Sequence, residues 1–204
     1  MKEKRNTKET IIEKSMKLFS VNGFHAVSIR QIADEVGIGN SALYKHFKSK
    51  QEIFDVIVER SKERYIGKCK SMVNSEIRGV EQVKDICIQM FRYQTEDEWI
   101  VMFRRLLIIE QFSNEKIANI YREFFIQIPL QSQQAIFEIL IEKGLMWKKN
   151  PVVLSMELYA PFFMYHTVNE QSKELIDLFK EHVEYFFENY MIVSTRGEEL
   201  WKNK

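Results

Sequence analysis

Residues 28–50 read Ser-Ile-Arg-Gln-Ile-Ala-Asp-Glu-Val-Gly-Ile-Gly-Asn-Ser-Ala-Leu-Tyr-Lys-His-Phe-Lys-Ser-Lys, and this stretch decides the fold of the first part of the chain. Ser28 can cap a helix with its hydroxyl, and Gln31 three residues later can return a bond to the backbone. Gly37 supplies a turn between this helix and a second short one. The pattern therefore predicts two short helices that cross at a glycine turn.

The apolar and polar residues of the two predicted helices fall on opposite sides. Ala33 is small where the second helix must cross closely. The apolar side is formed by Ile29, Ile32, Ala33, Val36, Ile38, Leu43 and Phe47. Short hydrogen-bonding groups on the other side suit base edges, and an aromatic hydroxyl and cations suit phosphates. The arrangement favours a helix-turn-helix that binds the major groove of DNA.

Candidate contacts follow from this division. We assign base contacts to Arg30, Asn40, Ser41 and Lys45. Phosphate contacts are assigned to Ser28, Tyr44, His46 and Lys50. The alternative is an ordinary three-helix subdomain whose cations are only solvated.

The same stretch resembles the N-terminal signature of TetR-family transcriptional regulators over about the first quarter of the chain. The matching positions are Ser28, Ile32-Ala33, Gly37, Leu43-Tyr44, His46-Phe47 and Lys50, with Ala26 and residues 18–24 upstream. Gly39 stands where a serine often begins the recognition helix, and Ser41 stands where glycine is common. The first departure removes a capping side chain, and the second adds a possible base contact.

The resemblance implies an all-α protein with a helix-turn-helix domain at residues 1–48 and a ligand-binding and dimerisation domain at residues 49–204. Residues 49–71 would form the helix that links them. It further implies a transcriptional repressor that leaves its palindromic operator when a small, largely apolar ligand binds. Such a ligand acts only by binding one conformation better than the other.

Charge and composition agree with a DNA contact near the N-terminus. Residues 1–50 carry ten Lys and Arg against five Asp and Glu, a net +5, so the rest of the chain carries −4. The basic N-terminal segment, with Lys2, Lys4, Arg5 and Lys8, can also reach a phosphate, or is simply solvated. Two cysteines, Cys69 and Cys87, suggest no disulfide framework or thiolate metal site. With no long apolar run, we expect a cytoplasmic protein without membrane contact.

Helix signals recur along nearly the whole chain, and seven glycines and three prolines leave little turn chemistry. The pairs Asn6 with Glu9, Ser49 with Glu52, and Thr95 with Glu98 have the spacing of capping boxes. Ser113 or Asn114 and then Asn150-Pro151 begin further helices. Pro129 fits a first helical turn, which predicts a separate helix at residues 130–143 that ends at Gly144. We expect nine or ten helices.

The last two predicted helices favour a homodimer. Eleven of the fourteen residues 152–165 are apolar, and a helix that is apolar all round must be covered on every side. Candidate interface residues are Leu158, Phe163, Leu175, Phe179, Val183 and Phe186. Two helix-turn-helix domains about 34 Å apart would match successive major grooves. The alternative is a fully intramolecular core.

The body of the chain is rich in aromatic residues, which often line cavities between helices. Candidate ligand-binding residues are Tyr65, Phe103, Leu107, Tyr121, Phe124, Phe162 and His166. His166 would orient a polar group of the ligand. Aromatic residues at helical spacing are also ordinary core residues, so both interpretations stay open.

No pattern in the chain supports catalysis, and we expect no enzyme, cofactor or metal site. The four histidines are scattered, and no glycine-rich phosphate loop is present. Glu110 and Glu138 lie among apolar residues, where each either binds a cationic ligand or marks the solvent face. Two other functions remain open: a DNA-bound structural or cell-division factor of the same fold without a ligand, and a helical protein that binds lipids or small molecules.

Overall fold

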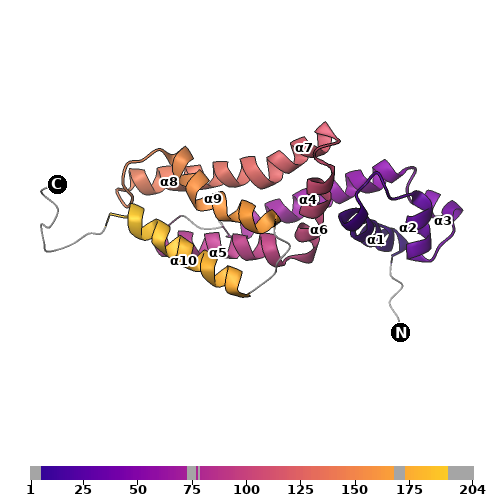
Figure 1. The fold of residues 1–204 in the computed structure, drawn as a ribbon, viewed down its shortest axis with the longest axis horizontal. Helices are drawn as coiled ribbons and strands as arrows, with labels where there is room; N and C mark the ends of the chain where they lie inside the picture. The colour runs from indigo at the N-terminus through magenta and orange to yellow at the C-terminus, as the bar shows by residue number, and fades with distance from the viewer. Residues whose placement is uncertain (1–5, 73–76, 78, 168–172, 193–204) are drawn as a thin grey trace, which may run out of the picture. The chain divides into compact units, whose positions relative to one another are not determined.

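The computed structural model describes residues 6–72, 77, 79–167 and 173–192 (Figure 1). These residues form ten α-helices and one π-helical turn, and the strand-like pairing among them is an isolated bridge between Met146 and Met191. The expected all-α fold is confirmed. Within this described part, no helix is long and apolar enough to cross a membrane.

The chain divides into two compact units. Unit 1 comprises residues 1–75 and 89–129, and unit 2 comprises residues 76–88 and 130–204. Unit 1 contains α1 (Thr7–Asn22), α2 (Ile29–Val36), α3 (Asn40–Tyr44), α4 (Lys50–Met72), the second half of α5 (Val80–Glu96), α6 (Glu98–Glu110), α7 (Glu115–Arg122) and the π turn η1 (Glu123–Gln127). The domain boundary at 48/49 stays a prediction. Within unit 1, α1 packs against both α4 and α6.

The helix-turn-helix forms as its local sequence predicts. The Ser28 hydroxyl accepts a bond from the Gln31 backbone, and the Gln31 side chain accepts one from the Ser28 backbone. Gly37 ends α2 in the left-handed conformation, at φ 78°, which a residue with a Cβ rarely adopts. Gly39 precedes α3 without a side-chain cap, as the departure from the family pattern implied.

Helix α1 begins at its predicted cap but without the predicted partner. The Asn6 side chain accepts a bond from the Lys8 backbone. Glu9 does not return a bond to Asn6; instead, its two carboxylate oxygens accept bonds of 2.5 and 2.6 Å from the Arg60 guanidinium in α4. A bidentate, charge-assisted pair is stronger than a bond to a neutral amide, so Glu9 pairs with the distant cation.

Helix α6 begins two residues later than predicted. The Thr95 hydroxyl donates to the Phe91 carbonyl, 2.8 Å away, inside α5, where threonine commonly bonds back to the preceding turn. Asp97 caps α6 instead, since its carboxylate accepts a 3.0 Å bond from the Ile100 amide. The predicted Thr95–Glu98 capping box is therefore wrong. Asn114 caps α7 as predicted.

Pro129 does not start a separate helix, which corrects the prediction for residues 130–143. Helix α8 (Ile128–Glu142) continues directly from α7 through η1. Proline has no N–H and its ring crowds the carbonyl four residues back. The chain relieves this by widening one turn, where the Ile128 amide donates to the Glu123 carbonyl, an i→i−5 bond.

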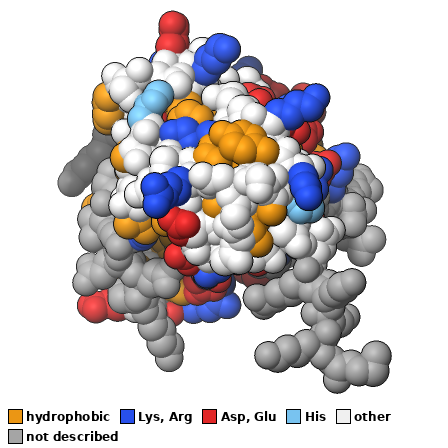
Figure 2. All heavy atoms as spheres, turned by 90° about the vertical axis from the view of Figure 1, so that its right-hand side faces the viewer, with side chains coloured by type: hydrophobic (Ala, Val, Ile, Leu, Met, Phe, Trp, Pro, Cys, Tyr) orange, Lys and Arg blue, Asp and Glu red, His pale blue; other side chains and the backbone are white. Residues whose placement is uncertain are grey.

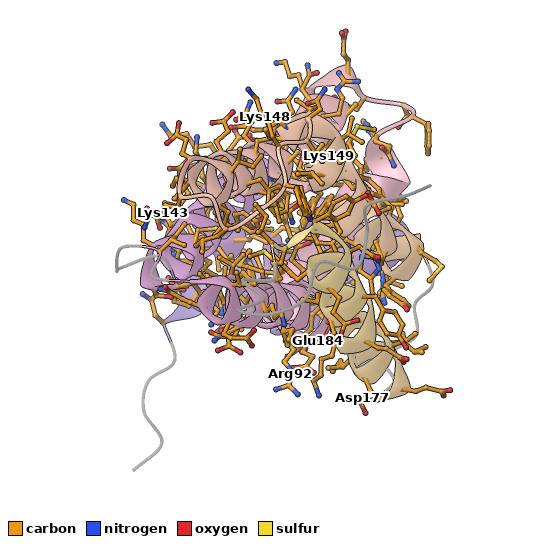
Figure 3. The ribbon with its side chains drawn as sticks, turned by 90° about the vertical axis from the view of Figure 1, so that its left-hand side faces the viewer. Arg92, Lys143, Lys148, Lys149, Asp177 and Glu184 are labelled. Carbon is orange, nitrogen blue, oxygen red and sulfur yellow. The ribbon has the colours of Figure 1, made fainter. Side chains whose placement is uncertain are left out.

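Unit 2 contains the start of α5, most of α8, α9 (Pro151–Thr167) and α10 (Lys173–Tyr190). The predicted Asn150-Pro151 start of α9 is confirmed, since the Asn150 side chain accepts a bond from Val152. Phe137 of α8 lies 5.6 Å from the Phe186 ring of α10, and Phe162 of α9 lies 5.0 Å from the Phe179 ring. Figure 3 shows Lys143, Lys148 and Lys149 around the end of α8 and the segment after it.

Candidate DNA-binding interface

The predicted DNA-contacting side chains gather on the exposed faces of α2 and α3. Ser28, Arg30, Asn40, Ser41, Tyr44, Lys45 and His46 are all exposed, and half of the Tyr44 surface, 53%, is accessible. Figure 2 faces the end of unit 1 that carries these helices and shows Lys and Arg side chains around a hydrophobic centre. The geometry suits a short helix that presents polar groups to base edges while cations beside it meet phosphates.

A rigid core holds this surface from behind. Leu43 and Phe47 are buried against Ile32 and Ala33 of α2. On its opposite side, α2 is joined to α1 by an ion pair of 2.8 Å between Lys14 and Glu35, and this bond lowers the pKa of the Glu35 carboxyl. Packing against α1 and this exposed ion pair therefore hold α2 and α3 in place behind the surface.

The Arg60–Glu9 pair ties α1 to α4 in the same manner. Both side chains are partly exposed, at 32% and 44%. The hydrogen bond from Arg60 lowers the pKa of the Glu9 carboxyl, and the same bond raises the pKa of Arg60. This pair joins the DNA-binding helices to the helix that was predicted to link them to the body.

Lys50, predicted as a phosphate contact, binds carbonyls of its own chain in this structure. Its ammonium donates bonds of 2.6 Å to the carbonyls of Phe24 and Val27 and 3.3 Å to that of His25, and it lies 4.4 Å from the centre of the Phe24 ring. Burial lowers the pKa of Lys50, and the Glu110 carboxylate opposes that change. All three protons of the ammonium therefore face the protein, which argues against a phosphate contact.

The sequence left two interpretations for Glu110, a contact to a cationic ligand or a position on the solvent face. The structure buries Glu110 and gives it partners within the chain. Only 4% of the residue is exposed. Its carboxylate accepts a 3.2 Å bond from the His25 backbone, 85 residues earlier in the chain. A glutamate among apolar residues at the end of a helix indicated a special position. Sequence spacing could not show that its partner is His25.

Five of the predicted ligand-binding residues come together in unit 1, namely Tyr65, Phe103, Leu107, Tyr121 and Phe124. All five are buried. The ring centroids of Phe103 and Tyr65 lie 5.5 and 6.0 Å from that of Phe124, and the Tyr121 ring lies 5.7 Å from that of Phe125. Phe162 lies in unit 2, and the side chain of His166 is outside the described residues.

Sequence analysis missed the polar residues beside this cluster. The Gln94 side chain donates a 3.2 Å bond to the Tyr65 hydroxyl, and the Arg104 guanidinium donates to the Gln94 carbonyl. Both residues are buried, and Arg104 also lies 6.0 Å from the Phe125 ring centre. Sequence position could have predicted the burial of Arg104, because it shares a helical face with the apolar residues Ile100 and Leu107.

A groove of about 330 Å³ opens among α1, α4 and α6. It is largely polar, with loose ion pairs of 3.7 Å between Arg64 and Asp97 and between Lys17 and Glu98. Trp99 forms its floor and is fixed by a 2.9 Å bond to the Ser61 hydroxyl. This groove does not contain the predicted ligand-binding residues.

Most of the predicted dimer residues are covered by their own chain. Leu158, Phe179, Val183 and Phe186 are buried in unit 2, whereas Phe163 and Leu175 are half-buried. The exposed apolar side chains of α9 and α10 are a different set, here called the α9–α10 apolar face: Val152, Val153, Met156, Met164, Leu178 and Tyr185. The dimer interface on these two helices stays a prediction, and the side chains that their own chain leaves exposed differ from those that were predicted.

Comparison with known proteins matches residues 11–57 to the family model of "Bacterial regulatory proteins, tetR family". The nucleoid occlusion factor SlmA of Photorhabdus laumondii is 24% identical over 160 residues, which cover 77% of this chain and 79% of that protein.

Two solved structures have similar folds. A TetR-family transcriptional regulator structure from Mesorhizobium loti, described as putative, has a TM-score of 0.68 at 21% identity, with 91% of this chain and 97% of that one covered. SmeT, the repressor of the Stenotrophomonas maltophilia multidrug efflux pump SmeDEF, has a TM-score of 0.66 at 20% identity, with 96% and 98% covered. Both likenesses concern the fold.

Proposed function

We propose that this chain is a TetR-family regulator, a dimeric transcriptional repressor that a small apolar ligand releases from a palindromic operator. The match of residues 11–57 to the family model supports this proposal. The observation that carries this proposal is the exposed polar face of α2 and α3. Its base-contact candidates Asn40, Ser41 and Lys45 are all accessible, while the residues behind them are buried.

A second copy of the chain would give the protein a two-fold symmetry that matches the palindrome. In the α9–α10 apolar face, the exposed Val152 and Met156 lie about one helical turn apart on α9, and Val153 and Met164 lie about three turns apart on one side of that helix. Exposed apolar surface of this kind marks an interaction site. A symmetric contact through this face brings two identical helix-turn-helix domains to one DNA site.

The aromatic cluster of unit 1 supports an apolar ligand. Its rings are buried beside the Tyr65 hydroxyl, Gln94 and Arg104. An apolar molecule with one polar group that displaced these rings would meet both kinds of contact. One of the similar structures is a SmeT–triclosan complex, with a TM-score of 0.67 at 19% identity. Triclosan is therefore a suitable first probe.

The test begins with selection of genomic fragments on the purified protein, followed by sedimentation equilibrium of the protein alone. We expect a dimer and an enriched palindrome that is bound about a thousandfold better than scrambled DNA at the same salt concentration. Equal affinity for all DNA would contradict the proposal. Release of the palindrome by triclosan, and not by its solvent, identifies an effector class.

The SlmA similarity favours one second function, a DNA-bound cell-division factor without a small-molecule effector. The same selection separates the two functions. A regulator enriches a few sites beside genes, whereas a factor of this kind enriches many sites dispersed over the chromosome, and its binding does not respond to apolar molecules.

A further inference from the structure

The segment between α1 and α2, residues 23–27, sets the direction in which the helix-turn-helix leaves α1. Phe24 anchors it, with its ring 5.4 Å from Phe19 of α1 and 5.1 Å from Phe54 of α4. Lys50 binds three of its carbonyls from the α4 side. A segment held by so many contacts has one shape, so any group that changes it redirects α2 and α3.

Glu110, the last residue of α6, holds the same segment from the other side. One carboxylate oxygen accepts the His25 amide at 3.2 Å, and the other lies 3.4 Å from the His25 Nε2 and from the Ser113 hydroxyl. The carboxylate is buried, and its attraction to Lys50 runs across the segment. Two opposite charges from α4 and α6 thus clamp one short connection.

Gly23 is the residue that admits the carboxylate. A Cβ at this position would lie 2.6 Å from the Glu110 Oε1 and 3.1 Å from the Ile109 Cγ2, which is too close for either. The glycine also has a φ of 82°, a conformation that other residues rarely adopt. The absence of a Cβ at Gly23 therefore leaves room for the carboxylate, and the positive φ independently favours glycine at this position.

Helix α6 connects this clamp to the aromatic cluster. Phe103 and Leu107 lie seven and three residues before Glu110 on the same 13-residue helix, and both are fully buried among the cluster's side chains. A displacement of the helix by a molecule among the rings must displace its last residue too, because a helix is stiff over three turns.

We propose that Glu110 is a positioning residue for operator recognition: through His25 and residues 23–27 it fixes the angle of the helix-turn-helix, and thereby the separation of half-sites that the dimer accepts. This inference rests on the proposed function, since only a dimer on a palindrome measures a separation. Glu110 itself touches no DNA.

The experiment measures the affinity of the full-length protein for the selected palindrome and for versions with one or two base pairs added or removed at its centre. For Glu110→Ala, the preference for the native separation falls about tenfold, because the clamp no longer holds one angle. Preference for the bases within each half-site stays unchanged. Glu110→Gln keeps an acceptor for the His25 amide but loses the charge, so it loses only a few-fold of that preference.

Glu98→Ala is the matched control. Glu98 lies on the same helix and pairs with Lys17 of α1 at 3.7 Å, but its side chain is 78% exposed. We expect its spacing profile to equal that of the wild type.

Four results overturn the inference. One is a Glu110→Ala protein whose affinity falls by the same factor for every half-site separation, which indicates a loss of stability alone. If that variant does not fold, a Glu110→Gln profile identical to the wild type has the same meaning. A selection that enriches no palindrome overturns the proposed function and this inference with it, whereas a defined palindrome with an unchanged profile overturns this inference alone.

Discussion

The exposed face of α2 and α3 and the connection at residues 23–27, in which Gly23, Phe24 and Val27 are buried, are neighbours in the chain but are stabilised in opposite ways. The face depends on local features: a capping box at Ser28, a left-handed Gly37, and apolar and polar residues at helical spacing. The connection depends on Lys50 and Glu110, which arrive from other helices. Chemistry for contacting DNA is thus encoded locally, and its orientation is encoded at a distance.

Lys50, which holds the connection, and Lys45, on the exposed face, give the largest expected difference in stability and in salt dependence. Lys50→Met keeps the aliphatic stem but leaves the Phe24 and Val27 carbonyls without their donor, so the free energy of unfolding falls by about 1–3 kcal/mol. The slope of log affinity against log salt stays unchanged, because no phosphate loses a cation. Lys45→Met has the reverse result, with stability unchanged and the slope reduced by about 0.9.

Chemical denaturation and binding titrations at four salt concentrations measure both quantities. A reduced slope for Lys50→Met would mean that its ammonium turns outward on DNA, and the contrast between the two regions would fail.

Two substitutions within α3 sharpen the comparison on its exposed side. Asn40→Ala removes a base contact, so sequence preference at one position relaxes by about 1–3 kcal/mol. Tyr44→Ala removes a phosphate contact and weakens binding to all sequences alike. A randomised-site selection with each variant distinguishes these outcomes. An unchanged preference for Asn40→Ala would remove that residue from the base contacts.

The smallest effect concerns the exposed Glu9–Arg60 pair behind the face. Glu9→Gln lowers stability by less than about 1 kcal/mol at neutral pH, because partly exposed ion pairs are screened by water. The pKa of Glu9 is lower in the folded protein than its ordinary value of 4.5. Its contribution is therefore complete above 4.5 and is lost as the pH falls through the folded value.

Thermal unfolding of wild type and Glu9→Gln between pH 7 and pH 3 measures this loss, with Glu13→Gln, an exposed carboxylate of the same helix, as the control. The two unfolding curves should converge in acid. A constant difference at every pH would show that charge is not what the pair contributes.

Sequence patterns predicted the helices wherever a local signal decided them. The caps at Asn6, Ser28 and Asn114, the glycine turn and the Asn150-Pro151 start are all confirmed, because each needs only residues within one turn. Predictions failed where another group, distant or in the preceding turn, competed, as for Thr95, which bonds to the Phe91 carbonyl. Glu9 left its expected partner for Arg60, and the helix around Pro129 continued through a π turn.

For the candidate site, sequence alone determined which residues of α2 and α3 are polar and exposed, because helical periodicity and one glycine turn suffice to sort them. The tertiary structure alone decided that Lys50 faces inward, that Glu110 reaches residue 25, and which side of α9 stays uncovered. These depend on contacts between helices far apart in the chain, and spacing within one helix carries no information about its partners.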